Sequence, residues 1–158
     1  MFGASSRASG QRSDLISGRP FSVFVYGTLK PGEENYERYC KKWVTQARAA
    51  TVKGELFDLP FGYPALTPGN SLVHGYLLSF VDPAVLTMLD ELEDYDPNRP
   101  LNQNEYLRVK TQAFSLNHRP LGQAWVYQMQ PERVAQSRGI RLLEGSWSNQ
   151  APFQQVSL

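Results

Sequence analysis

The sequence predicts a single α+β domain whose mixed or largely antiparallel sheet can close into a small β-barrel flanked by a few helices. Segments with the composition and two-residue alternation of strands outnumber segments with helical periodicity. Few strand–helix–strand units are evident, which disfavours a doubly wound parallel sheet. The chain has 158 residues and 41% hydrophobic residues, which suits one domain with a sizeable core.

We expect this domain to occupy residues 21–150 and to be followed by a short tail at 151–158. Residues 1–20 are rich in Ser, Gly and Arg and are expected to be disordered. They have no apolar central region, so they lack the pattern of a secretory signal. Their excess of Arg over acidic residues leaves a transit peptide as the alternative.

The first half of the domain is expected to contain three strands and one helix. Residues 21–26 are apolar, β-branched and aromatic and form the first strand. Residues 33–49 repeat aromatic side chains at three- and four-residue spacing, which indicates a helix. Residues 51–59 and 73–80 have strand patterns, and the Gly- and Pro-rich stretch 61–69 between them reads as a loop.

The second half begins with a helix. Asp82 is its expected cap and Pro83 its first residue. The polar residues 94–104 then predict a surface loop. Two further strands and a last helix follow, at residues 105–113, 122–129 and 131–139.

Composition disfavours several classes of protein. A net charge of +1 offers no clustered basic face for nucleic acid, and no window approaches the roughly 18 apolar residues of a membrane span. Cys40 is the only cysteine, so no internal disulfide can form and a cytoplasmic protein is expected. With His74 and His118 as the only histidines, no metal-ligand spacing is recognisable and no metal site is expected.

The first predicted strand ends in Tyr26-Gly27-Thr28-Leu29. An apolar run that breaks abruptly into Gly-Thr indicates a tight loop whose backbone N–H groups are free of a β-ladder. Oriented peptide dipoles in such a loop can hold a carboxylate or a phosphate, and glycine lets the ligand come close. The loop is therefore a candidate anion site.

Residues 89–95 place several carboxylates at the C-terminal end of the second helix. The helix dipole disfavours negative charge there, and partial burial would raise the pKa of one carboxyl toward the range of a general acid or base. Glu93 lies four residues after Leu89 at one edge of the buried stripe, and Asp90 lies at the other edge. Glu91 points away. Spacing alone leaves both Glu93 and Asp90 as candidates, beside the alternative of a solvated acidic helix end.

Taken together, Tyr26-Gly27-Thr28-Leu29 and Leu89-Asp90-Glu91-Leu92-Glu93 resemble the motifs of the γ-glutamylcyclotransferase-like superfamily. The resemblance is greatest to its compact branch, which includes γ-glutamylamine cyclotransferase, and it covers residues 21–147 in the right order. Further matches are Gly62-Tyr63-Pro64-Ala65-Leu66, the strand with Gly75, Glu105-Tyr106-Leu107-Arg108 and Gly145-Ser146-Trp147.

The resemblance implies a small β-barrel whose pocket is floored by the loop 26–29, with Glu93 as the catalytic residue. It also implies release of 5-oxoproline from a small γ-glutamyl amine or peptide. The backbone N–H groups of Gly27, Thr28 and Leu29 would hold the substrate's α-carboxylate. Glu93 would accept a proton from the α-ammonium and later donate one to the leaving amine. Because the attacking amine belongs to the substrate, no metal or organic cofactor is required.

Tyr63 and Tyr106 are further candidates for substrate contacts. For Tyr63, in the Gly- and Pro-rich stretch, lining the pocket and packing beneath a tight loop are both open. For Tyr106, on an expected strand, the alternative is an ordinary inward-facing aromatic. The only partner expected is the small-molecule γ-glutamyl substrate, and we expect a monomer or a weak homo-oligomer.

The sequence departs from the family pattern at two places. Asp94 stands where a glycine commonly follows the catalytic acid, and its charge should raise the pKa of Glu93 if it is not solvated. The run 95–104 lengthens the connection to the next strand and is a candidate lid. Both changes leave room for an alternative function, a non-catalytic module of the same fold that binds a small carboxylate.

Overall fold

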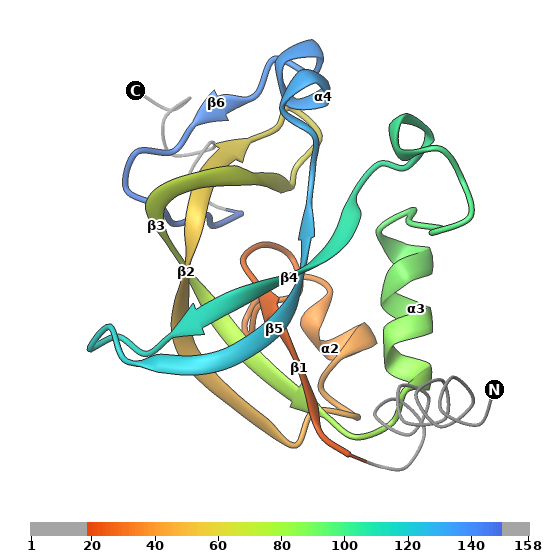
Figure 1. Cartoon of the computed structure of the whole chain (residues 1–158), viewed down its shortest axis with the longest axis vertical. Helices are drawn as coiled ribbons and strands as arrows, with labels where there is room; N and C mark the ends of the chain where they lie inside the picture. Colours follow the sequence, from red (N-terminus) through yellow and green to blue (C-terminus); the bar gives the residue numbers. More distant parts are fainter. Residues whose placement is uncertain (1–18, 150–158) are drawn as a thin grey trace, which may run out of the picture.

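The computed structural model describes residues 19–149 (Figure 1). Its strands are β1 (Phe21–Val25), β2 (Gln46–Asp58), β3 (Pro64–Phe80), β4 (Leu107–Phe114), β5 (Pro120–Gln128) and the short β6 (Ile140–Arg141). Its helices are α2 (Tyr36–Tyr39), α3 (Ala84–Leu92), the 3₁₀ helix η1 (Leu101–Gln103) and α4 (Pro131–Gln136). The expected disordered segment 1–20, apart from its last two residues, and the tail 151–158 lie outside the described residues.

The strands β1 to β5 form a closed barrel. Neighbours follow the order β3-β1-β5-β4-β2, and β2 pairs with β3 to close the circle. Every pairing is antiparallel except that of β1 with β5, which is parallel. The predicted α+β class with a small mixed barrel is therefore confirmed.

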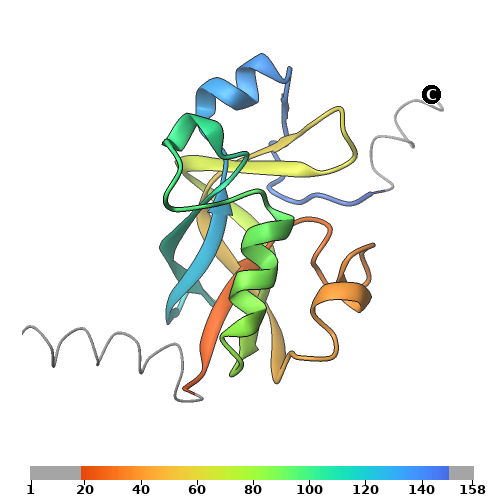
Figure 2. The same cartoon turned by 90° about the vertical axis from the view of Figure 1, so that its right-hand side faces the viewer.

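Alternate residues of β1 face two different hydrophobic clusters, as the two-residue period of a strand requires. Phe24 belongs to the cluster inside the barrel, together with Val52 and Val126. Val23 and Val25 belong to a second cluster that includes Leu89 of α3. Figures 1 and 2 show α3 along one side of the barrel, so this second cluster joins helix to barrel.

The start of α3 follows the prediction. Pro83 directly precedes the helix with helical backbone angles, and the Oδ1 atom of Asp82 accepts a hydrogen bond from the N–H of Ala84 at 2.9 Å. This bond satisfies one of the amide groups that a helix N-terminus leaves free. No helix among residues 19–149 is long and apolar enough to cross a membrane.

Two predicted elements differ most in extent from the structure, and the last helix, predicted at 131–139, also ends earlier, at Gln136. The helix predicted at 33–49 is reduced to α2, because the chain from Gln46 onward pairs with β3. The loop predicted at 61–69 is shorter, because residues 64–67 pair with residues 55–58. In both places long-range strand pairing overrides the local pattern.

Candidate active site

A cavity of about 270 Å³ opens at the end of β1, beside the C-terminal end of α3. Six stretches of chain supply its walls: the end of β1 with the loop that follows it, the segment before α2, the connection from β2 to β3, the end of α3, the segment before β4, and β5. The sequence-predicted site residues all line this cavity: Tyr26, Gly27, Thr28, Leu29, Tyr63, Glu93 and Tyr106.

The loop after β1 presents backbone N–H groups that make no internal hydrogen bond. Within residues 19–149, the N–H groups of Gly27, Thr28 and Leu29 donate to no protein acceptor. The turn itself is held by the N–H of Lys30, which donates to Gly27 O at 3.0 Å, and by Asn35, whose side chain donates to Thr28 Oγ1 at 2.9 Å. The predicted free amide groups are therefore present, on a loop whose shape other bonds maintain.

Gly27 is required for close packing at this point. A Cβ atom added to it would lie 2.7 Å from the ring carbons of Pro64 at the start of β3. The ring of Pro64 is itself part of the cavity wall. Glycine therefore lets the loop and β3 approach each other around the cavity.

Glu93 is the first residue beyond α3, and its backbone N–H donates to Leu89 O at 2.9 Å. Its half-buried side chain lines the cavity. Burial, and secondly the nearby charge of Glu105, raise the pKa of Glu93 from its ordinary 4.5 to about 8. Among residues 19–149, no basic side chain forms an ion pair with it. Glu93 can therefore hold or release a proton near neutral pH.

Asp94 follows in the left-handed backbone conformation, with φ 56°. Its N–H donates to Glu91 O at 3.2 Å, and the N–H of Tyr95 donates to Asp90 O at 2.9 Å. These two bonds make the Schellman motif that commonly ends a helix, in which Asp94 takes the position that glycine prefers. The requirement for a left-handed backbone explains why a glycine is favoured after the acid.

The sequence suggested that the charge of Asp94 would raise the pKa of Glu93 if the Asp94 side chain were not solvated. In the structure this side chain is solvated. It is exposed and forms an ion pair with Arg99 at 3.0 Å. Glu105, which sequence reasoning missed as a site residue, supplies the neighbouring negative charge instead. No periodicity or spacing relates Glu105 to Glu93; only the fold brings the two together.

Asp90, the other acidic candidate, belongs to a separate network. Its carboxylate accepts hydrogen bonds from Arg108 Nε at 2.8 Å and from the hydroxyl of Tyr127 at 2.7 Å. The guanidinium of Arg108 also stacks on the ring of Trp125, 4.3 Å from its centroid. Asp90 does not line the cavity. It joins α3 to β4 and β5, and its carboxylate is already paired.

The two predicted tyrosines line the cavity and are held in different ways. The hydroxyl of Tyr63 donates to Glu105 Oε2 at 2.5 Å, and that of Tyr106 donates to Pro64 O at 2.6 Å. Burial raises the pKa of both hydroxyls, so both stay protonated near neutral pH. Tyr127 of β5 also lines the cavity.

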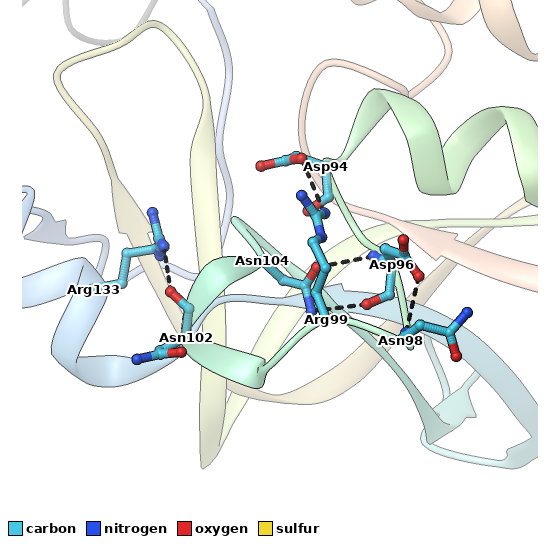
Figure 3. Close-up of polar contacts among 7 residues, drawn as sticks. All are labelled: Asp94, Asp96, Asn98, Arg99, Asn102, Asn104 and Arg133. Carbon is cyan, nitrogen blue, oxygen red and sulfur yellow. Dashed lines mark hydrogen bonds and ion pairs between the residues drawn. The ribbon is translucent and has the colours of Figure 1, made fainter.

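The segment 95–104 is folded on itself, as Figure 3 shows. Arg99 reaches back to the backbone oxygen of Asp94 at 2.9 Å, and the buried side chain of Asn104 makes two hydrogen bonds with the backbone of Asp96, at 2.9 and 3.2 Å. None of these ten residues lines the cavity. The predicted surface loop thus has an ordered interior, and it does not form a lid in this structure.

Two other groups bear on the chemistry. Cys40 is fully buried, and burial together with the charge of Glu93 raises the pKa of its thiol to about 12. It is therefore a poor nucleophile, since the thiolate is the reactive form. In the part of the chain that the structure describes, no group of three or more His, Cys, Asp or Glu side chains is placed to hold a metal ion.

The cavity thus combines a proton-carrying carboxyl with a set of free backbone N–H groups. Such an arrangement can bind a small molecule through a carboxylate and transfer protons within it. It offers no activated nucleophile among the described side chains that line it.

Known proteins resemble this chain in sequence and in fold. The family model described as "Gamma-glutamyl cyclotransferase, AIG2-like" matches residues 23–149. Among curated proteins, the chain is 36% identical over 115 residues to the γ-L-glutamyl-butirosin B γ-glutamyl cyclotransferase of Niallia circulans, and the match covers 71% of each chain.

Solved structures with the same fold include an AIG2-like protein of Mus musculus and the protein YtfP of Escherichia coli. The first has a TM-score of 0.62 and 24% identity, and the match covers 85% of this chain and 92% of that one. The second has a TM-score of 0.54 and 27% identity, and the match covers 80% of this chain and 96% of that one. Because the mouse protein is only 24% identical in sequence, its similarity to this chain concerns the fold.

Proposed function

The chain belongs to the AIG2-like γ-glutamyl cyclotransferase family and is an enzyme of that class; we propose that it releases 5-oxoproline from a small γ-glutamyl amine or peptide, with Glu93 as general base and general acid. One observation carries the proposal. The free N–H groups of Gly27, Thr28 and Leu29 and the carboxyl of Glu93 line the same small cavity.

The loop would hold the substrate by its α-carboxylate. Three backbone N–H groups without internal partners suit an anion of this size, and desolvated donors gain most from an ionised acceptor. Gly27 adds no side chain that would keep the carboxylate away. A substrate bound at this point carries its α-ammonium into the cavity that Glu93 lines.

The reaction would then move two protons from the α-nitrogen to the leaving nitrogen. Ionised Glu93 accepts the first proton from the α-ammonium, and the resulting amine attacks the γ-carbonyl carbon of the same molecule. The new carbon–nitrogen bond closes the five-membered ring, and the bond from that carbon to the leaving nitrogen breaks as Glu93 gives it the proton. Glu93 then takes up the second proton that the ring nitrogen loses and passes it to the departing amine. The products are 5-oxoproline and the leaving amine as its ammonium ion, and Glu93 is again ionised.

The energetics match what the site contains. Ring closure joins two parts of one molecule, so orientation in the cavity can supply several kcal/mol of the barrier, by an order-of-magnitude argument. A positioned general base or acid typically contributes about 10²–10⁴-fold in rate. Together these effects require no covalent intermediate with the protein.

The test is 5-oxoproline release from a panel of γ-glutamyl amines and peptides by wild type, Glu93→Gln and Glu91→Gln. Glu91 is an exposed acid on α3, two positions away, and serves as the matched control. We expect turnover by wild type and Glu91→Gln, and loss of at least about a hundredfold in Glu93→Gln. Retained turnover in Glu93→Gln would remove that residue from its proposed role.

The panel also tests the alternative function. Binding of γ-glutamyl compounds without any 5-oxoproline release by wild type would favour a non-catalytic binding module. The cavity position of Glu93 and its raised pKa support the enzyme over that alternative, because a binding module has no need of a poised proton carrier.

A further inference from the structure

Glu105 is a second carboxylate of the cavity, and the proposed reaction gives it no role. It precedes β4, and its side chain lines the cavity wall together with Glu93. Two contacts fix its place. Its backbone N–H donates to Asp94 O at 3.1 Å, directly beside Glu93, and its Oε2 atom accepts the 2.5 Å hydrogen bond from Tyr63.

The titratable groups whose own pKa the charge of Glu93 raises are uncharged near neutral pH. They are Tyr26 beside β1, Cys40 after α2, Tyr63 before β3, Tyr106 before β4 and Tyr127 on β5. Burial raises the pKa of every one of them. Because these groups are uncharged, the electrostatic field at Glu93 comes from the remaining charged groups.

Charged groups elsewhere around the site are paired or exposed. Asp90 and Arg108 form an ion pair with each other, and Lys30 donates to the backbone oxygen of Trp147. Glu34 also lines the cavity, but it is exposed, so solvent screens its charge. Arg133 lies near Tyr63, and its guanidinium donates to Asn102 O at 3.1 Å. Glu105 is therefore the charged group most directly coupled to Glu93.

We propose that Glu105, anchored by Tyr63, forms with Glu93 a paired-carboxylate site for the substrate's α-ammonium. This inference rests on the proposed function. Two carboxylates in one small cavity repel each other, so one of them retains its proton. An ammonium group bound to the pair offsets that repulsion, so Glu93 releases its proton to solvent and is present in the base form that the reaction needs. Substrate binding itself would thus prepare the base.

The experiment follows the titration of Glu93 directly, by ¹³C NMR of the side-chain carboxyls in the full-length protein. Wild type, Glu105→Gln and Asp94→Asn are compared. Asp94 is the matched control, because it adjoins Glu93 in the chain but is exposed and paired with Arg99. We expect the Glu93 midpoint to fall by about one pH unit in Glu105→Gln and to stay in place in Asp94→Asn. An unmoved midpoint in Glu105→Gln, or an equal shift in both variants, would overturn the proposal.

Kinetics separate this inference from the proposed function. In Glu105→Gln, the acid limb of kcat/KM for 5-oxoproline release should move down with the NMR midpoint, and Glu105→Asp should restore part of the wild-type position. A purely structural role for Glu105 would lower the rate without moving the limb. If wild type releases 5-oxoproline and Glu93→Gln does not, an unmoved limb contradicts only the role of Glu105. If Glu93→Gln remains active, the proposed function itself has failed.

Discussion

Ionising a carboxyl group inside a cavity lowers the free energy of unfolding. The pKa of Glu93 is raised to about 8 by burial and by Glu105, against 4.5 in an unfolded chain. The folded state therefore holds the proton more tightly than the unfolded state does. The stability that this proton contributes is fully present below about pH 4.5 and is lost as the pH rises through 8.

Glu93→Gln should remove this pH dependence. Relative to wild type, the variant should gain about 2–4 kcal/mol in free energy of unfolding between pH 4 and pH 9, because the glutamine cannot ionise. Urea denaturation at a series of pH values measures the difference, with Glu91→Gln as the exposed control. Parallel curves for wild type and Glu93→Gln would show that Glu93 titrates as an ordinary solvent-exposed carboxyl.

Asp94 gives a second prediction, which concerns backbone conformation. Glycine adopts its left-handed angles without strain, whereas alanine does not. Asp94→Gly should therefore be more stable than Asp94→Ala by about 1 kcal/mol, although both lose the ion pair with Arg99. Urea midpoints of the two variants provide the measurement. Equal stabilities would argue against the Schellman motif as the ending of α3.

The acidic residues of the site also show how much of it could be predicted from the sequence. Helical spacing reduced the acidic run to Glu93 and Asp90, and the fold then separated them by placing Asp90 against Arg108. The importance of Glu105 could not be predicted from spacing, because it reaches Glu93 through the chain reversal between α3 and β4. Its position within the Glu105-Tyr106-Leu107-Arg108 match was the one signal available.

At the level of elements, the site depends on how closely the loop after β1 packs on the start of β3. Gly27 and Pro64 make that contact. Pro64 has little freedom to retreat, since it pairs with Asp58 and its carbonyl accepts the hydroxyl of Tyr106. This contact therefore helps to fix the position of the loop that carries the free N–H groups.

Gly27→Ala should therefore weaken both folding and substrate binding. The added methyl group meets the Pro64 ring, and overpacking of this kind costs about 1–3 kcal/mol. Urea denaturation and KM for 5-oxoproline release are the measurements. The double variant Gly27→Ala/Pro64→Ala should recover part of the stability, because the ring is gone. Additive losses in the double variant would mean that this contact is not the cause.

Element boundaries were predicted well where a local signal exists and poorly where pairing decides. The Asp82 and Pro83 signals located the start of α3 because capping acts over three residues. The aromatic spacing in 33–49 suggested a helix, yet the chain from Gln46 onward is taken up by pairing with β3. Trp43, on the apolar face of that expected helix, is 40% exposed.

For the whole molecule, the last described segment packs against the barrel. Trp147 is buried in the barrel cluster, and its indole N–H donates to Asp58 Oδ1 at 2.9 Å. Lys30, next to the anion-site loop, donates to Trp147 O. Trp147, near the C-terminal end of the family match, is thus bound to Lys30, near its N-terminal end and next to the candidate site.

Replacing Trp147 should therefore affect the entire domain. Trp147→Ala should lower the free energy of unfolding by about 3–5 kcal/mol, as expected for loss of a buried aromatic side chain. Leu143→Ala, four residues earlier and 85% exposed, is the control and should change it by less than about 0.5 kcal/mol. A small effect of Trp147→Ala would mean that this segment packs only loosely on the barrel.

The barrel as a whole could be predicted as a class but not as a topology. The strand patterns indicated a mixed or antiparallel sheet, whereas closure depends on the parallel pairing of β1 with β5, which are almost a hundred residues apart. Contacts of that kind leave no local pattern in the sequence. The strand patterns allowed a closed barrel, and the resemblance of the two motifs to the γ-glutamylcyclotransferase-like superfamily implied one.

The measurement that tests the central claim most directly is the pH dependence of kcat/KM for 5-oxoproline release by the wild-type enzyme. If Glu93 in its cavity is the base, the acid limb should have its midpoint near pH 8, where the free enzyme loses that proton. A midpoint near 4.5, the ordinary value for a glutamate, would contradict a buried base.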